Sequence, residues 1–186
     1  MAAGPVLATW ERFFPESPPV GFLLRKNHPG RWLRFHTLPD AKRVPKSASE
    51  IEEVLQRINQ ISGEIFEPRS QATLWITSFS PFRPSLPADQ WTGFEAVAEP
   101  PIVWTSALQD YVDVQHMAVW ARTKEWAWEH VAFFFREVSL DRLDYVTAFS
   151  PHTGATICPY DGGIDIFLPD ARKRAALKRK FKNWLP

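Results

Sequence analysis

Apolar residues recur along the chain with two different periods, and these periods predict both helices and strands. The clearest helix is predicted from Ser47 to Ile65, where apolar side chains at three- and four-residue spacing form one continuous stripe. Ser47 and Glu50 have the spacing of a capping box, which marks the start of a helix. Further helices are predicted at residues 5–14, 125–138 and 170–185.

Alternation of apolar and polar residues predicts strands between these helices. In the segment 31–38, Trp32, Arg34 and His36 fall on one face, and Leu33, Phe35 and Thr37 fall on the other. The segment 20–25 is expected to pair with it as a hairpin across the five-residue loop 26–30. The other predicted strands are residues 72–79, 94–98, 112–122, 143–149, 156–158 and 164–168, and residues 80–88 are predicted to be a loop.

This order of elements predicts an α+β fold with a mostly antiparallel sheet packed by amphipathic helices. The chain has 186 residues, of which 45% are hydrophobic, and this is enough to build a core of ordinary size. No repeat, low-complexity tract or linker interrupts it. We therefore expect a single domain spanning residues 1–186.

The charge of the chain is unevenly distributed. The net charge is +1, but residues 170–186 hold seven lysines and arginines and one acid, so the preceding residues carry −5. The predicted C-terminal helix is therefore basic, with Leu177, Phe181, Trp184 and Leu185 as its apolar anchors.

Cysteine usage and hydropathy predict a soluble cytoplasmic protein. The single cysteine, Cys158, cannot form an intrachain disulfide and lies in an apolar segment, so we expect it in the core. The first residues lack the pattern of a signal peptide, and no apolar run approaches the ~20 residues that cross a bilayer.

The stretch 157–167 brings two apolar runs together at a turn formed by Tyr160, Asp161, Gly162 and Gly163. We expect positive φ angles at the two glycines, which would let the backbone reverse or bulge.

Two aspartates flank this turn. Asp161 and Asp165 could join His36 or His152 as a metal site or as an acid–base pair. In the alternative interpretation, Asp161 satisfies turn amides and Asp165 faces solvent or an arginine. The sequence has no His-x-x-x-His motif, no pair of cysteines and no dense cluster of carboxylates, so we predict neither a metal nor a cofactor.

A second group of polar residues lies near the predicted strand 31–38. Arg31, Arg34 and His36, with Lys42 and Arg43 just after them, could bind an anion or a partner, because a guanidinium offers two parallel donors to a carboxylate or phosphate. An outer strand whose arginines pair with the acidic body explains the same residues. The residues of the candidate binding site are therefore Arg31, Arg34, His36, Tyr160, Asp161 and Asp165.

Motifs for nucleophilic or phosphate chemistry are missing from the sequence. It has no Gly-x-Ser-x-Gly elbow and no glycine-rich phosphate loop, so we assign no catalytic residue. The aromatic segment 125–138 has two interpretations, an exposed protein interface or a helix buried on two sides.

Three segments carry a resemblance to a known family. They are residues 149–154 (Phe-Ser-Pro-His-Thr-Gly), Tyr160-Asp161-x-Gly163-x-Asp165, and residues 180–185 (Lys-Phe-Lys-Asn-Trp-Leu). Together they resemble the C-terminal signature of a bacterial domain of unknown function, and residues 30–39 resemble the N-terminal part of such proteins. Gly162 stands where that pattern has a larger polar or basic residue. The resemblance implies a bacterial origin and an α+β domain, and it brings no activity with it.

Two functional hypotheses follow. The favoured one is a non-enzymatic protein-binding domain, of the immunity (toxin-neutralising) kind, that occludes its partner through aromatic anchors and charged rims. The alternative is a small-ligand or anion-binding domain, or a hydrolase-like enzyme, in which Arg34 and His36 meet Tyr160, Asp161 and Asp165. We predict no specific nucleic-acid partner, because the basic helix adjoins an acidic body, and no membrane partner, because no apolar run is long enough to cross a bilayer.

Overall fold

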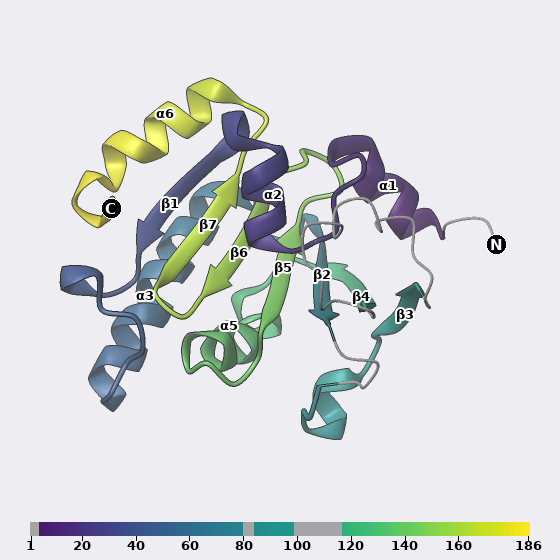
Figure 1. The fold of residues 1–186 in the computed structure, drawn as a ribbon, viewed down its shortest axis with the longest axis horizontal. Helices are drawn as coiled ribbons and strands as arrows, with labels where there is room; N and C mark the ends of the chain where they lie inside the picture. The colour runs from purple at the N-terminus through teal and green to yellow at the C-terminus, as the bar shows by residue number, and fades with distance from the viewer. Residues whose placement is uncertain (1–3, 80–83, 99–116) are drawn as a thin grey trace.

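The computed structural model describes residues 4–79, 84–98 and 117–186, which form a seven-stranded sheet with helices on both faces (Figure 1). The strand order is β1-β7-β6-β5-β2-β4-β3, and all neighbouring strands are antiparallel. This confirms the predicted α+β class. The strands are β1 (Trp32–His36), β2 (Gln71–Ser78), β3 (Glu95–Ala98), β4 (Ala118–Glu125), β5 (Tyr145–Phe149), β6 (Thr156–Tyr160) and β7 (Gly163–Phe167).

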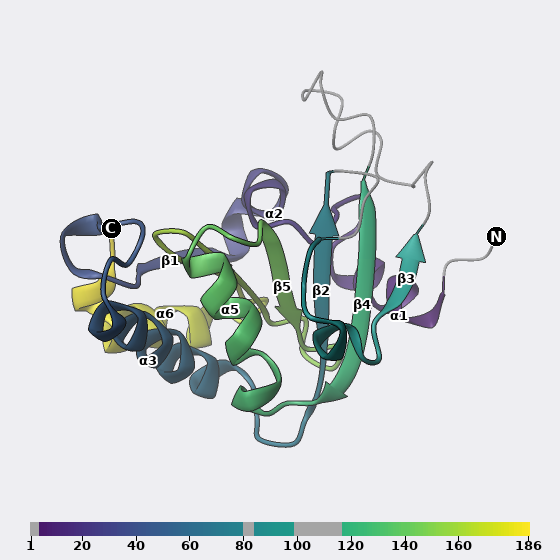
Figure 2. The same cartoon turned by 90° about the horizontal axis from the view of Figure 1, so that it is seen from below.

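The helices form two layers, one on each face of the sheet. Figure 1 shows α2 in front of β6 and β7 and α3 behind them, and Figure 2 gives the perpendicular view. Apolar side chains of α1 and α2 pack on one face, and those of α3, α5 and α6 pack on the other. The helices are α1 (Pro5–Phe13), α2 (Gly21–Asn27), α3 (Ala48–Ile65), α5 (Ala132–Ser139) and α6 (Ala171–Lys180).

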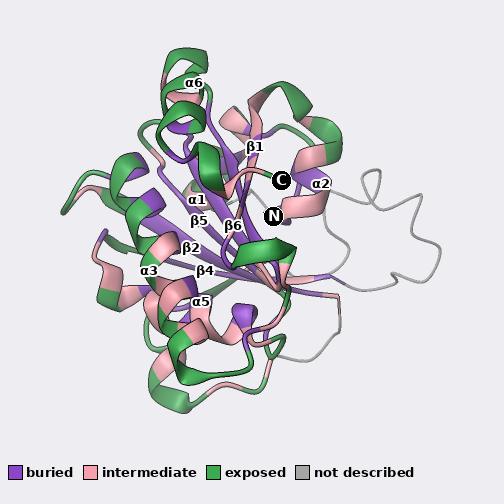
Figure 3. Ribbon diagram, turned by 90° about the vertical axis from the view of Figure 1, so that its left-hand side faces the viewer, coloured by how far each residue is buried: buried purple, intermediate pink, exposed green. Residues whose placement is uncertain are grey.

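The core is divided between these two faces because side chains alternate along each strand. Leu33 and Phe35 of β1 share one face and Trp32 lies on the other, as predicted; the first two pack on the α3 and α6 side, and Trp32 packs on the α1 and α2 side. On that side Trp10 of α1 packs edge-on against Trp75 at a centroid distance of 5.4 Å. Figure 3 shows the central strands buried beneath helices whose outer surfaces are exposed. The sheet is therefore covered on both sides.

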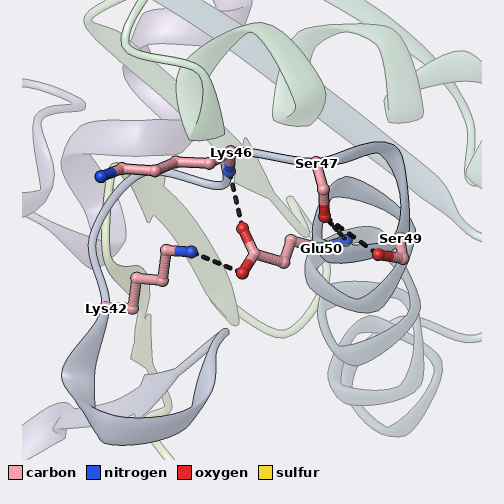
Figure 4. Close-up of polar contacts among 5 residues, drawn as sticks. All are labelled: Lys42, Lys46, Ser47, Ser49 and Glu50. Atoms are coloured by element: carbon pink, nitrogen blue, oxygen red, sulfur yellow. Dashed lines mark hydrogen bonds and ion pairs between the residues drawn. The ribbon is translucent and has the colours of Figure 1, made fainter.

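The start of α3 is fixed by the predicted capping residues (Figure 4). Ser47 Oγ accepts a hydrogen bond from the Glu50 amide at 3.2 Å, which satisfies one of the free donors of the first turn. The Glu50 carboxylate accepts from the Lys46 amide at 2.6 Å and also binds Lys42 Nζ. The hydrogen bond from Lys42 is the main cause that lowers the pKa of Glu50.

The predicted hairpin between residues 20–25 and 31–38 is wrong. Residues 21–27 form α2, and the Leu24 amide donates to the Val20 carbonyl at 2.9 Å. A seven-residue helix is too short for periodicity to separate it from a strand. α2 packs closely on the sheet, because a Cβ added to Gly21 would lie 2.9 Å from Cys158 Cβ. β1 pairs with β7 instead.

Two predicted helices are shorter than expected. Glu125 ends β4, a 3₁₀ turn occupies Trp128–His130, and α5 begins only at Ala132. The C-terminal helix α6 ends at Lys180 and continues as a 3₁₀ turn at Lys182–Trp184.

Parts of two other predicted elements lie outside the described residues. These are residues 80–83 of the predicted loop and residues 112–116, with His116, of the predicted strand 112–122. The remainder of that strand has the expected faces, since Trp120 joins the α3 side and Val119 and Ala121 join the α1 side.

The turn between β6 and β7 differs from its prediction. Among the glycines that the structure describes, positive φ occurs at Gly93 and Gly154, and not at Gly162 or Gly163. Gly163 is required by close packing, because an added Cβ would overlap the Phe35 carbonyl and lie 2.6 Å from the Tyr160 hydroxyl. The register that pairs β1 with β7 creates this crowding.

Candidate functional site

The two predicted polar groups meet where β1 lies beside β7. Arg34 is opposite Asp165 in the antiparallel register, and its guanidinium forms a two-pronged pair with the carboxylate at 2.7 and 2.8 Å. Trp32 Nε1 donates to the same carboxylate at 2.8 Å. Asp165 is buried, with 4% of its side chain exposed, whereas 24% of the Arg34 side chain is exposed. The Asp165 carboxylate is thus held by three donors.

Aromatic rings surround this ion pair. The Arg34 guanidinium lies 4.4 Å from the ring centre of Tyr160 and 5.5 Å from that of Trp32, and Arg25 of α2 approaches Trp32 at 5.6 Å. Burial raises the pKa of Tyr160 to about 12, and the carboxylate of Asp165 adds to this effect while Arg34 opposes it. The hydrogen bond to Asp165 raises the pKa of Arg34. Arg34 therefore stays protonated and is held in place.

The other predicted site residues are distributed around this cluster. Asp161 pairs with Arg43, whose guanidinium lies 2.6 Å away and whose side chain is 74% exposed. His36 is opposite Gly163 at the end of β1, two positions beyond Arg34. Arg31 is directed elsewhere, since it donates to the Phe13 carbonyl at 2.7 Å beside α1. The structure therefore brings five of the six candidate residues to one region of β1, β6, β7 and the turn between β6 and β7, and directs Arg31 elsewhere.

This geometry limits the chemistry of the cluster. A carboxylate that accepts three hydrogen bonds has few lone pairs left to bind a metal or to accept a substrate proton. The exposed part of Arg34 can still donate to an anion. Within residues 4–79, 84–98 and 117–186 no group of three or more His, Cys, Asp or Glu side chains could hold a metal ion.

A different surface lies at the C-terminal end of the described chain, around Trp184. The Trp184 ring is half-buried and stacks on Phe181 at 4.8 Å, and Phe181 in turn packs edge-on against Phe35 of β1. Arg57 of α3 lies over the Trp184 ring at 5.0 Å and also binds the carboxylate of Glu53. The tryptophan is therefore held rigidly while part of its ring remains accessible.

Surface hollows flank Trp184 on both sides. One hollow, of about 540 Å³, lies between Trp184 and the loop after β1, where Asp40 and Ala41 both have positive φ. The other, of about 400 Å³, lies between Trp184 and the outer face of α3. Arg57 lines both hollows. An arginine and a tryptophan at the centre of a hollowed surface are typical of residues that anchor a protein interface.

The helix before Trp184 carries a strip of positive charge. Four cationic side chains of this strip are exposed and form no ion pair within the described parts of the chain, whereas Lys180 pairs with Glu64 at 2.7 Å. Lys173 and Arg174 are half-buried and donate to backbone carbonyls. The basic strip consists of Arg172, Lys178, Arg179 and Lys182.

Local sequence patterns predicted only part of these surfaces. The period of α6 indicated Leu177, Phe181 and Trp184 as inward anchors, yet Trp184 is half-buried because a 3₁₀ turn displaces it from the helix. Arg57 lies on the polar side of α3, and no local pattern connects it with Trp184. A long-range contact of this kind has no signal in a single sequence.

The aromatic segment 125–138 is directed toward the core, which resolves its two interpretations. Trp126 stacks on Phe66 at 4.1 Å, and Phe134 and Phe135 are buried. Trp128 and Phe133 are partly buried and pack against the same cluster.

The single cysteine, Cys158, is buried as well, and burial raises the pKa of its thiol. In the described parts of the chain, no helix combines the length and apolar character needed to cross a membrane.

Comparison with known proteins assigns the chain to a family. No curated protein and no solved structure matches the sequence. A family model, described as a domain of unknown function (DUF3885), matches residues 20–186 and so covers everything from the residue before α2 to the end of the chain. The resemblance to a family of unknown function is thereby confirmed, and the chain belongs to the DUF3885 family.

Proposed function

We propose that this chain is a non-enzymatic protein-binding domain, of the immunity kind, that neutralises a bacterial toxin by covering the toxin's functional surface. The observation that carries the proposal is Trp184, a rigid and partly exposed tryptophan between two surface hollows. Large aromatic residues held in place before binding lose little conformational entropy and supply much of the affinity of protein interfaces.

The positive charge of the basic strip indicates what kind of partner this surface would bind. The basic strip of α6 leads directly to Trp184 along the chain, and its four cations lack ion-pair partners among the described residues. Exposed charges of one sign accelerate association with a partner of the opposite sign. We therefore propose a partner with an acidic surface, which contacts α6 first and then covers Trp184. The single buried cysteine is compatible with a cytoplasmic site of action.

A photo-crosslinking experiment tests this proposal. A photoreactive amino acid at Asn183, which is exposed and lines the larger hollow, leaves Trp184 intact. The matched control places the same group at Ala8, an exposed position of α1 on the other face of the sheet. We expect one protein to be captured in native cells from position 183 and not from position 8.

Variants then separate the anchor from the charge. Trp184→Ala should weaken binding of the captured protein by about tenfold or more, mainly through faster dissociation. Replacing Lys178, Arg179 and Lys182 with glutamine should instead slow association and reduce its dependence on salt. Capture of the same proteins from both positions, or unchanged affinity in folded Trp184→Ala protein, would contradict the proposal.

The immunity role has its own test. The captured protein, expressed alone, should arrest bacterial growth, and co-expression of this chain should restore growth. Co-expression of the Trp184→Ala chain should restore it poorly. A captured protein without toxicity would leave a protein-binding domain but would exclude the immunity role.

A second candidate function rests on the partly exposed guanidinium of Arg34. The alternative hypothesis requires Arg34 and His36 to meet Tyr160, Asp161 and Asp165, and these residues lie in one region formed by β1, β6, β7 and the turn between β6 and β7. Small-anion binding fits this cluster better than hydrolysis, because Asp165 is already held by three donors. Titration with inorganic phosphate, monitored by isothermal titration calorimetry, tests it. Binding that is lost in Arg34→Gln but kept in Arg31→Gln would favour this second function.

A further inference from the structure

A buried arginine on the opposite side of the sheet has no carboxylate partner among the described residues. Arg122 of β4 is only 9% exposed, and its guanidinium lies 4.6 Å from the ring centre of Phe94 and 5.4 Å from that of Phe134. It donates to two backbone carbonyls, those of Thr92 at 3.3 Å and His130 at 2.9 Å. Within the three described ranges of the chain, Arg122 forms no salt bridge with an aspartate or glutamate.

This arrangement differs from that of the other arginine in the sheet. The charge of Arg34 is neutralised by Asp165. Among the residues that the structure describes, the charge of Arg122 is offset by carbonyl dipoles and ring faces alone, and burial lowers the pKa of its guanidinium. Buried charges in proteins are generally paired with an opposite charge, because removing an ion from water is costly. An opposite charge is therefore expected near Arg122.

Arg122 lines a small hollow. Its volume is about 20 Å³, which is room for roughly one particle the size of a water molecule. Leu74 is opposite Arg122 in the register between β2 and β4, and Ala72 is opposite Lys124, so apolar side chains form part of its lining. The segment Trp126–Val131 lines it as well, through Trp126, Ala127, His130 and Val131.

A second cation lines the same hollow. Lys124 follows Arg122 by two positions and so lies on the same face of β4. Its ammonium group forms no salt bridge in the part of the chain that the structure describes. The other titratable groups of the lining are Glu125, which is exposed and belongs to the opposite face by alternation, and His130, whose Nδ1 lies 3.1 Å from the Glu125 carbonyl.

We propose that this hollow binds one small inorganic monovalent anion, such as chloride, between Arg122 and Lys124. Two cations that form no salt bridge within the described residues supply the attraction, and the small volume of the hollow favours a monatomic ion over phosphate or an organic acid. The bound ion completes a bridge, because Arg122 already joins the residues before β3 to the 3₁₀ turn before α5 through its two carbonyl contacts. Anion binding therefore stabilises the folded chain.

Thermal unfolding at constant ionic strength tests the proposal. Replacing ~0.2 M sodium gluconate with the same concentration of sodium chloride should raise Tm by about 2–4 °C, because a ligand that binds only the folded state stabilises it. Arg122→Met should abolish the difference between the two salts. The matched control, Arg172→Met on the exposed face of α6, should retain it.

Two further measurements keep the test decisive. If Arg122→Met does not fold, Lys124→Met, which changes an exposed side chain, should reduce the chloride effect by half or more. Chloride-35 NMR should show line broadening with wild-type protein that is lost in the same variants. Equal Tm in chloride and gluconate, or an equal chloride effect in wild type and both variants, would overturn the proposal.

Discussion

At the scale of single residues, the region where β1 meets β7 leaves little room for change. Gly163 lies against the Phe35 carbonyl and the Tyr160 hydroxyl, and Asp165 is enclosed by Trp32 and Arg34. The function of each residue here depends on contacts with residues far away in the sequence. A substitution should therefore affect stability according to the space and hydrogen bonds at that position.

Gly163→Ala should destabilise the protein by about 1–3 kcal/mol, because the new methyl group overlaps the neighbouring strand and forces a backbone shift. Gly63→Ala is the matched control. Gly63 is exposed within α3, and a Cβ added there meets nothing within 4 Å. Gly63→Ala should raise the free energy of unfolding by about 0.5–1 kcal/mol, because alanine favours a helix more than glycine does. Urea denaturation measures both, and an unchanged stability of Gly163→Ala would refute the packing argument.

His28 should make stability depend on pH. Its Nε2 lies 3.0 Å from Ser17 Oγ, and burial, assisted by the charge of Arg31, lowers the pKa of the imidazole in the folded protein. The unfolded chain, with a histidine pKa of about 6.5, then binds the proton more readily. This contribution to stability is complete above about pH 6.5 and is lost as the pH falls below that value.

The measurement is the Tm between pH 7.5 and about 5. His28→Gln should show a smaller decline with falling pH than wild type, because glutamine cannot take up the proton. His152→Gln, at an exposed turn position, should follow the wild-type curve. Parallel curves for wild type and His28→Gln would show that His28 does not contribute.

At the scale of elements, α6 and the 3₁₀ turn after it have different structural roles. Leu177 and Phe181 attach the helix to the core, whereas Trp184 remains partly exposed beyond the end of α6. Asp170 caps the helix start by accepting from the amides of Arg172 and Lys173 at 2.8 and 3.2 Å. The basic strip is thus presented by an element that is fixed at both ends.

Because Phe181 is buried and Trp184 is partly exposed, we expect their substitution by alanine to lower the free energy of unfolding by different amounts. Phe181→Ala should cost about 3–4 kcal/mol, because it leaves a cavity against Phe35. Trp184→Ala should cost only about 1–2 kcal/mol, because part of the ring already contacts water. Chemical denaturation of both variants provides the comparison. A larger loss for Trp184→Ala would identify it as a core residue and weaken the proposed interface.

At the scale of the whole molecule, the distribution of charge restricts the partners. Residues 170–186 carry +6 and the preceding residues carry −5. Of the basic side chains on α6, Lys180 is paired with Glu64, and Lys173 and Arg174 bind backbone carbonyls. A polyanion would therefore meet a narrow basic strip beside an acidic body.

We expect nucleic acid to bind this strip weakly and without sequence preference, with a Kd no tighter than ~10⁻⁶ M at physiological salt. Fluorescence titration with single- and double-stranded DNA at two salt concentrations measures the affinity and its salt dependence. Replacing Arg172, Lys178 and Arg179 with glutamine should remove most of the residual binding. Nanomolar affinity that persists at ~0.2 M salt would reverse the expectation.

The sequence by itself determined those elements whose signals are local. The stripe and capping residues specify α3, alternation specifies the faces of β1 and β4, and the succession of short apolar runs specifies β5, β6 and β7. Hydrophobic periods and caps act within one or two turns of chain, so they can be recognised without knowledge of the fold. The family and the α+β class also follow from the sequence.

The tertiary structure alone decided the contacts that make a site. α2 is helical because its leucines pack on the sheet, and Arg34 meets Asp165 across 131 positions because β1 selects β7 as its partner. The burial of Arg122 and the exposure of Trp184 have the same origin. In each case the conformation is selected by the free energy of desolvation and packing between segments that are far apart in the sequence. These free energies depend on how the whole chain is arranged, so a local sequence pattern does not reveal them.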